Sequence, residues 1–357
     1  MRPALLCMIV LQTYASAQEA DSGFELRTTV SQAVSESPQL QAEPGDVPVS
    51  GGFRAVLYPT WKWSRHWTVS GAVQTYSEPY FYSEFSAGGH RVKTDILQAN
   101  LSYSQFWKNA SLVVRLGQIP TAFGSFPLRY DDAQNPLIDL PMAYGYYGSS
   151  VSMVGLTGAQ VDVTLGKADL RAQFVNSSPA NPRTVFDRDQ YGNWAGGVGY
   201  TIRQGFRVGI SAYRGPYLDR HFAYYFPGEA PPRDLPATAY GLDVQWARGH
   251  WNVSGEWQHF QMTYRKIPTF NEHTGYAEAR LVLSPRWYAA TRAGYIRTGP
   301  FPGREAYEFV AGFRPNRIQL VKVGYEIQRG PAIQGLQANT LSLQLVTAFR
   351  AISIARD

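Results

Sequence analysis

The chain has 357 residues, of which 17% are charged and 14% are aromatic, and its formal net charge is +6. A soluble domain carries about 25% charged residues, so this composition is unusual for one. The positive charge is too mild and too scattered to indicate nucleic acid as a partner. Beyond the first residues, no segment has the ~20 apolar residues that a membrane helix needs.

The first 17 residues have the layout of a secretory signal peptide. Arg2 is followed by an apolar run from Ala4 to Leu11, and Ala15-Ser16-Ala17 offers small residues for cleavage. We therefore expect a signal peptide over 1–17 and one mature domain over 18–357, with a buried N-terminal strand as the alternative. Cys7 is the only cysteine and lies inside this segment, so the mature chain would have no disulfide.

An exported chain that is rich in aromatic residues, without a membrane helix, is either a secreted β protein or an outer-membrane β-barrel. Apolar and polar residues alternate with period two over segments of strand length, which is the strand signal. The predicted strands, in chain order, are Gly23–Ser35, Gly52–Tyr58, Trp67–Thr75, Asp95–Gln105, Leu112–Leu116, Thr157–Val163, Leu170–Phe174, Trp194–Ile202, Phe206–Ala212, Tyr240–Trp246, Trp251–Trp257, Ala277–Leu283, Trp287–Tyr295, Tyr307–Phe313, Val321–Ile327 and Leu341–Phe349.

The connections between these segments alternate between short turns and longer loops, which is typical of a porin. Single-chain bacterial barrels have an even number of strands, so the weakest segment, Gly23–Ser35, is kept as the first strand. A sheet edge in hydrocarbon would leave backbone groups unpaired, so the last strand must pair with the first. We therefore predict an all-β, antiparallel, up-and-down transmembrane barrel of about 16 strands, with short periplasmic turns and long outer loops.

The apolar side of each predicted strand is assigned to lipid, which places the charged side chains on the lumen side. A soluble sheet with one wet face would sort its residues in the same way, so this sorting does not exclude that alternative. The predicted pore wall carries seven basic and seven acidic residues: Arg27, Arg54, Arg115, Arg171, Arg280, Arg292 and Lys322, with Glu25, Asp162, Asp243, Glu256, Glu278, Glu308 and Glu326.

Aromatic residues cluster at both ends of the predicted strands, as the two interfaces of a bilayer require. Those near the short turns are Trp61, Trp63, Trp67, Trp107, Phe206, Trp246, Trp251, Trp287 and Phe313. Those near the loops are Tyr76, Phe174, Trp194, Tyr240, Trp257, Tyr295 and Tyr307. Sixteen amphipathic strands without a helix are also too many for an ordinary sandwich, so we favour the membrane barrel.

The third outer loop, over 119–151, contains Pro120, Pro127, Pro136 and Pro141, which exclude a regular strand or helix. Loops of this length usually have a function. We expect this loop to fold into the barrel and narrow it, with a loop on the outer surface as the alternative. The predicted constriction comprises Arg115, Arg129, Asp131, Asp132 and Asp139.

Two roles are open for the loop carboxylates, Asp131 and Asp132. They could bind a cation, or they could pair with Arg129 or with arginines of the wall and fix the loop, which we favour. The apolar loop side chains should pack against the barrel rather than face water; they are Leu137, Ile138, Leu140, Met142, Tyr144, Tyr146 and Tyr147.

The mature chain resembles a bacterial porin over its whole length, and Phe349 resembles the aromatic residue at the end of many outer-membrane barrels, although RAISIARD follows it. Gly117-Gln118-Ile119-Pro120, followed by Phe123-Gly124, is similar to a motif of the phosphate-selective porin family. That resemblance implies a basic ladder in the lumen. The equal numbers of basic and acidic wall residues predict instead a weak preference for anions without phosphate specificity.

The sequence therefore predicts a diffusion porin of the bacterial outer membrane, without a cofactor, metal or catalytic site. Its expected partners are small polar solutes, outer-membrane lipid and lipopolysaccharide, and the barrel assembly machinery, and a homotrimer is left open. One alternative is a closed structural or adhesive barrel that acts through Tyr-rich loops such as Asp219–Pro236. Another is a barrel hydrolase using His259 and His273 beside an outer loop, although no nucleophile motif accompanies them.

Overall fold

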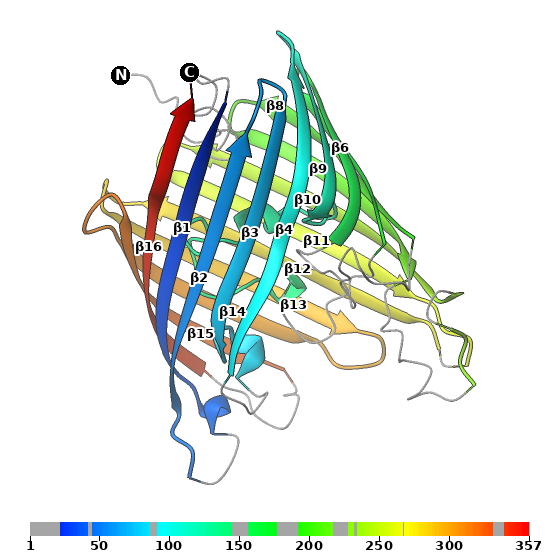
Figure 1. The fold of residues 1–357 in the computed structure, drawn as a ribbon. Coiled ribbons are helices and arrows are strands. Elements are labelled where there is room, and N and C mark those ends of the chain that lie inside the picture. The colour runs from blue at the N-terminus through cyan, green and yellow to red at the C-terminus, as the bar shows by residue number, and fades with distance from the viewer. Residues whose placement is uncertain are drawn as a thin grey trace.

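The protein is described by a computed structural model, which places residues 22–41, 45–85, 91–144, 156–176, 192–216, 228–231, 234–266, 268–330 and 339–356. The predicted signal peptide, over 1–17, and the last part of the third loop, over 145–155, lie outside the described residues. One antiparallel sheet closes on itself into a barrel of sixteen strands (Figure 1). The predicted fold is therefore confirmed.

Each strand pairs with the strands before and after it in the chain, and short turns alternate with long loops, as predicted. The strands are β1 (Ser22–Glu36), β2 (Val49–Lys62), β3 (Trp67–Glu78), β4 (Arg91–Phe106), β5 (Ala110–Ile119), β6 (Leu156–Leu165), β7 (Ala168–Val175), β8 (Asn193–Arg203), β9 (Phe206–Pro216), β10 (Pro236–Arg248), β11 (Trp251–Met262), β12 (Phe270–Val282), β13 (Trp287–Thr298), β14 (Arg304–Phe313), β15 (Gln319–Arg329) and β16 (Asn339–Arg356).

The barrel closes through β1 and β16, where Thr28 lies opposite Phe349. Because closure gives every strand two neighbours, the sheet has no open edge. In the described ranges the helical elements are four 3₁₀ turns, η1 (Pro38–Leu40), η2 (Tyr82–Glu84), η3 (Phe126–Arg129) and η4 (Met142–Tyr144). No helix among the described residues is long and apolar enough to cross a membrane.

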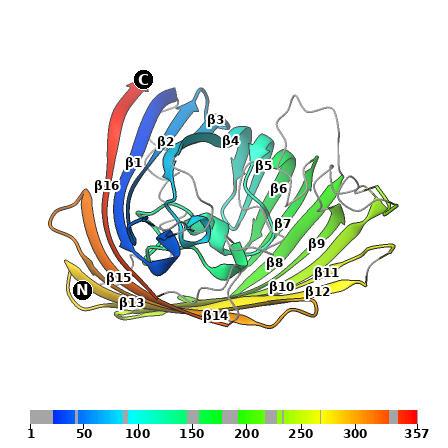
Figure 2. The ribbon, with the colours of Figure 1, turned by 90° about the horizontal axis from the view of Figure 1, so that it is seen from below.

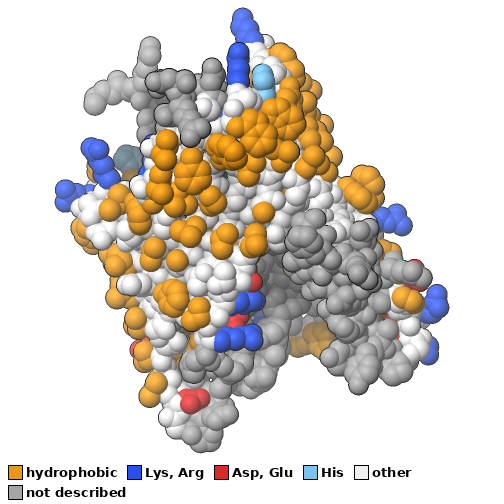
Figure 3. All heavy atoms as spheres, in the orientation of Figure 1, with side chains coloured by type: hydrophobic (Ala, Val, Ile, Leu, Met, Phe, Trp, Pro, Cys, Tyr) orange, Lys and Arg blue, Asp and Glu red, His pale blue; other side chains and the backbone are white. Residues whose placement is uncertain are grey.

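The outer surface of the barrel is apolar, as the alternating pattern predicts. Hydrophobic side chains cover the face formed by β16 and β1–β4 in Figure 3. Aromatic rings are exposed at both strand ends, with Trp107 56% and Trp251 47% exposed near the turns, and Trp194 64% and Tyr240 58% exposed near the loops. An apolar band between two aromatic rims matches a bilayer and indicates that the barrel spans one.

One member of the predicted aromatic rim is wrong. Tyr76 is only 6% exposed and packs inside the barrel with Phe81 and Tyr144. It follows the apolar side of its strand by one residue, and successive side chains of a strand point to opposite faces. Tyr76 therefore belongs to the lumen side, where it supports the loops that fold inward.

Apolar pockets on the inner wall receive these loops. Viewed along the barrel in Figure 2, the segment between β5 and β6 lies inside the ring of strands. Leu137, at 0% exposure, packs against Val310 and Leu320 of the wall, and Met142 packs against Ile296. Burying a side chain of this size contributes about 1.5–3 kcal/mol, which explains why the third loop lies against the wall.

Candidate functional site: the charged interior of the barrel

Wall carboxylates hold the backbone of the third loop. The N–H groups of Ile138 and Asp139 donate to Glu308 over 2.7 and 3.1 Å. Farther along the wall, the backbone N–H and the hydroxyl of Ser125 donate to Glu256 over 3.2 and 3.1 Å. A loop without regular structure leaves its own amides unpaired, so these acids supply the acceptors that buried backbone requires.

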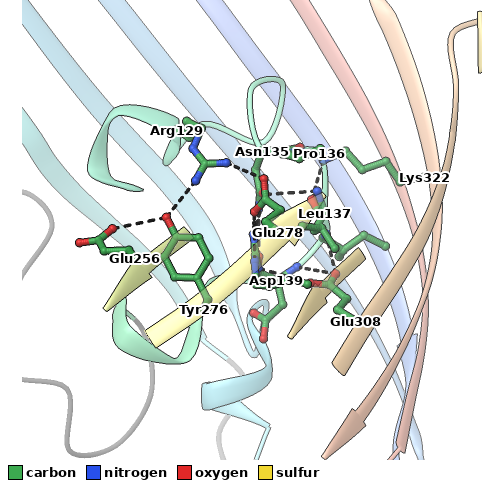
Figure 4. Close-up of polar contacts among 12 residues, drawn as sticks. Arg129, Asn135, Pro136, Leu137, Asp139, Glu256, Tyr276, Glu278, Glu308 and Lys322 are labelled. Atoms are coloured by element: carbon green, nitrogen blue, oxygen red, sulfur yellow. Dashed lines mark hydrogen bonds and ion pairs between the residues drawn. The ribbon is translucent and has the colours of Figure 1, made fainter. Parts of the chain in front are cut away.

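Wall cations hold the carbonyl groups of the same loop. The Lys322 ammonium, fully buried, donates to the carbonyl oxygens of Asp132, Asn135 and Leu137 over 2.8 to 2.9 Å (Figure 4). The Arg292 guanidinium donates to the carbonyl oxygen of Asp139 over 2.8 Å. These bonds use all three protons of the ammonium, so Lys322 ties three carbonyl groups of the turn over 132–137 to the wall.

The charged side chains of the loop bind the wall rather than one another. Arg129 donates to Glu278 and, over 2.9 Å, to the Tyr276 hydroxyl (Figure 4). Asp132 accepts from Arg54 over 2.9 Å, with both side chains 3% exposed or less. Its neighbour Asp131 accepts from the Tyr58 hydroxyl and the N–H of Ala133. Asp132 therefore pairs with a wall arginine, which is the arrangement that we favoured for both carboxylates, whereas the partners of Asp131 are a tyrosine and a backbone amide.

Gly124, in the stretch that resembles the phosphate-selective porin motif, has a structural reason to be glycine. Its φ is +79°, and a Cβ atom there would collide with the Tyr144 hydroxyl and with Glu256. Tyr144 donates to Glu256 at this point. The close approach of loop and wall therefore needs both the left-handed backbone and the missing side chain.

A second loop, between β3 and β4, also folds inward, and the sequence reasoning missed it. The Tyr80 hydroxyl donates to Asp132 over 3.1 Å, and the N–H of Tyr82 donates to Asp139 over 3.3 Å. Glu84 accepts from the N–H groups of Tyr80 and Phe81. The run of aromatic residues from Tyr80 to Phe85 was the available signal, because such a run seldom faces water.

The predicted site residues divide by exposure. Eight acids are buried: Asp131, Asp132, Asp139, Asp243, Glu256, Glu278, Glu308 and Glu326. Three bases are buried: Arg54, Arg292 and Lys322. The residues that keep access to water are five bases, Arg27, Arg115, Arg129, Arg171 and Arg280, and two acids, Glu25 and Asp162. The assignment of these residues to a constriction and a pore wall stays a prediction.

The structure does not bring Arg115 to the loop carboxylates. Its guanidinium donates to Asp162 of the neighbouring strand, on the wall. The sequence reasoning also missed Arg207, which lies between Asp169 and Asp243, bonded to them over 2.7 and 2.6 Å. The signal was available in the alternation, because Phe206 and Val208 face lipid and Arg207 between them must then face the lumen.

A cavity of about 1010 Å³ lies between the third loop and the short turns. It is lined by β1–β4 and β16, and residues 127–134 of the loop lie against it. The cations Arg27, Lys62, Arg65 and Arg350 line this vestibule, against the single carboxylate of Asp131. Among the described residues no three His, Cys, Asp or Glu side chains are grouped to hold a metal.

No protein-family model matches the chain, and no curated protein matches it in sequence. Solved structures do match. OprB of Pseudomonas putida has a TM-score of 0.66 at 11% identity, over 95% of this chain and 96% of that one. An anion-selective porin from Comamonas acidovorans has a TM-score of 0.61 at 12% identity, over 92% and 100% of the two chains.

OmpT of Vibrio cholerae, in a structure described as a trimer form, has a TM-score of 0.57 at 10% identity, over 92% of this chain and 100% of that one. Identities this low carry no information on the solute, but the agreement extends over nearly the whole of each chain. The protein therefore has the fold of a bacterial outer-membrane porin.

Proposed function

We propose that the protein is a porin of the bacterial outer membrane, through which small polar solutes diffuse passively with a weak preference for anions. The observation that carries this proposal is the unequal burial of the interior charges. The loops and neighbouring side chains bury eight of the predicted site's acids and three of its bases. Among the predicted site residues, the groups with access to water are then five bases and two acids.

A wall charge acts most strongly on a solute in contact with it, because salt screens the interaction between charges that are more than about 8 Å apart. The buried acids are already bonded: Glu278 to Arg129 and Arg292, and Glu308 to loop amides and Arg292. A passing solute therefore meets mainly guanidinium groups. The preference stays weak because Arg115 has Asp162 beside it.

Two finer points belong to this proposal. The pore wall does not carry the basic ladder that the resemblance to the phosphate-selective family implies, because its predicted basic and acidic residues are equal in number, so we propose no phosphate-specific wall. The trimer form described for Vibrio cholerae OmpT leads us to propose a homotrimer here. Sedimentation of the detergent-extracted protein tests the trimer, and a monomer at all concentrations would contradict it.

The experiment is conductance in a planar bilayer with a KCl gradient. The parent should give discrete steps and a reversal potential whose sign indicates anion preference. Arg171→Gln removes an exposed lumen cation and should reduce that preference, whereas Arg248→Gln, at an exposed turn on the outward side of β10, should leave it unchanged. A folded parent without conductance would contradict the porin, and a cation-selective parent would contradict the preference.

The two alternatives have less support. A closed structural barrel would not conduct, so the same recording tests it. For the hydrolase, the rings of His259 and His273 lie 4.4 Å apart beside Trp257, which is exposed on the outward face of β11. That position, away from the lumen, does not favour a catalytic pair. Hydrolysis of lipid or peptide by the purified barrel would revive this alternative.

A further inference from the structure

Two arginines face each other on the vestibule wall. Arg27 of β1 and Arg350 of β16 are direct partners in the strand register. Like charges directly opposite each other destabilise a sheet. The sequence of β1 and β16 therefore departs from what stability alone would select, and departures of this kind concentrate at functional sites.

A single carboxylate serves both guanidinium groups. Glu25 lies 3.0 Å from Arg350 and 3.6 Å from Arg27. In the part of the chain that the structure describes, no other acid is within ion-pair distance of either arginine. The pair therefore keeps one uncompensated positive charge, and its side chains are 39% and 49% exposed.

The surroundings of the pair suit a small anion. Lys62 and Arg65 line the same cavity of about 1010 Å³, and so do hydroxyl groups of Thr60 and Ser102. The one lining carboxylate, Asp131, is bonded to Tyr58. Four cations and several hydroxyl groups thus line one cavity between the loop and the turns.

We propose that the vestibule holds small dianions on the pair Arg27 and Arg350, as a binding step before or after passage through the barrel. This inference rests on the proposed porin function and names its solute class. Each planar guanidinium can present two parallel donors to the oxygen atoms of a carboxylate or a phosphate. The pair keeps one positive charge beyond that of Glu25, and Lys62 and Arg65 add two more to the same cavity, so the charge of a dianion is balanced there. A dianion can also bond to both guanidinium groups at once, whereas the single carboxylate of a monoanion such as acetate bonds to one.

Inhibition of the chloride current tests the inference. Succinate and phosphate serve as dianion probes, and acetate is the monoanion control. In the parent, the dianions should halve the current at a concentration about tenfold below that of acetate, because one additional charged hydrogen-bond pair supplies roughly that factor. If succinate inhibits at the lower concentration, the site prefers dicarboxylates. If phosphate does, the site prefers phosphate groups.

Three variants locate the effect. Arg27→Gln and Arg350→Gln should each raise the half-effect concentration of succinate about tenfold. Glu25→Gln removes the competing carboxylate and should lower it. Arg203→Gln is the matched control, because Arg203 ends β8 at a short turn outside the vestibule lining, and its variant should behave as the parent does.

The outcomes separate this inference from the porin itself. A conducting parent that responds equally to succinate and acetate contradicts the dianion site, and so does equal weakening by Arg203→Gln and Arg350→Gln. A folded parent that does not conduct contradicts the porin function instead. In that case, calorimetric titration of succinate into the detergent-extracted parent and the Arg27→Gln/Arg350→Gln double variant still decides whether the site binds.

Discussion

At the scale of single residues, the interior is held together by buried charges whose partners come from distant parts of the chain. Arg54 and Asp132 form a pair that is 78 residues apart in sequence, and Arg54 also lies over the Tyr130 ring at 4.3 Å. Removing one member of such a pair is costly, since the other remains buried without its counter-charge.

The first prediction compares the two neighbouring loop carboxylates. Asp132→Asn should destabilise the folded barrel by about 3 kcal/mol, because Arg54 then stays buried without an anion. Asp131→Asn should cost less than about 1.5 kcal/mol, because its recorded partners, Tyr58 and the N–H of Ala133, are neutral donors. Urea unfolding of both variants measures the difference, and equal losses would contradict the importance of the ion pair.

The second prediction concerns pH and the inward loop between β3 and β4. Burial raises the pKa of Glu84 above its ordinary value of 4.5, although two backbone N–H groups donate to the carboxylate and lower it. The native state therefore binds a proton more readily than the unfolded chain does. The stability that Glu84 contributes is present below pH 4.5 and is lost as the pH rises through the raised pKa.

Glu84→Gln keeps an acceptor for the N–H groups but cannot ionise. The unfolding temperature of the parent should therefore fall relative to this variant as the pH rises above 4.5. Glu36→Gln, at the end of β1, is the control, because Glu36 is exposed. Parallel pH curves for the parent and Glu84→Gln would show that this carboxyl is not coupled to folding.

At the scale of elements, the third loop determines which wall charges a solute can reach. It is bonded to β2, β11, β12, β13, β14 and β15 through Arg54, Glu256, Glu278, Arg292, Glu308 and Lys322. The loop between β3 and β4 packs on it through Tyr80 and Tyr82. Several anchors on both sides indicate a fixed structure rather than a lid that opens.

The third prediction is that deleting Ser125 to Met142, with a short Gly-Ser linker, changes both the size and the charge of the opening. Conductance should rise and larger solutes should pass, because the segment no longer occupies the interior. The anion preference should also decrease, because the deletion removes the partly exposed Arg129 and uncovers three wall acids, Glu256, Glu278 and Glu308, together with three wall bases, Arg54, Arg292 and Lys322, which brings the accessible charges closer to balance. If the variant folds and conducts as the parent does, with the same reversal potential, the segment lies outside the solute path.

At the scale of the whole molecule, closure of the sheet controls stability. The β1–β16 pairing extends over the length of β1, from Ser22 to Glu36, so opening the barrel requires breaking a complete strand pair. Hydrocarbon around the barrel offers no partner for the freed backbone groups. Unfolding should therefore be slow even in detergent.

The fourth prediction follows from this closure. The unheated protein should migrate faster than the boiled protein on a detergent gel, because the closed barrel stays compact. Circular dichroism should show strand without helix. Equal mobility of heated and unheated samples, or substantial helix, would be incompatible with the closed barrel.

The fold class, the strand positions and the face of each strand could be predicted from the amino-acid sequence alone. This was possible because a bilayer imposes period-two alternation and aromatic rims locally, as in Trp251 to Trp257, without reference to distant residues. Tyr76 shows the limit of this reasoning: an aromatic residue near a strand end belongs to lipid or lumen according to its place in the alternation, and composition alone does not decide.

Which charges face water and which fix a loop depends on contacts that form only in the folded barrel. Glu308 and Glu25 both lie on the lumen side, yet Glu308 is buried under loop amides and Glu25 serves two exposed arginines. Nothing in the local sequence distinguishes them, because the difference arises from contacts 170 residues apart in the chain. The opposition of Arg27 and Arg350 has the same origin, since barrel closure brings the two ends of the sheet together.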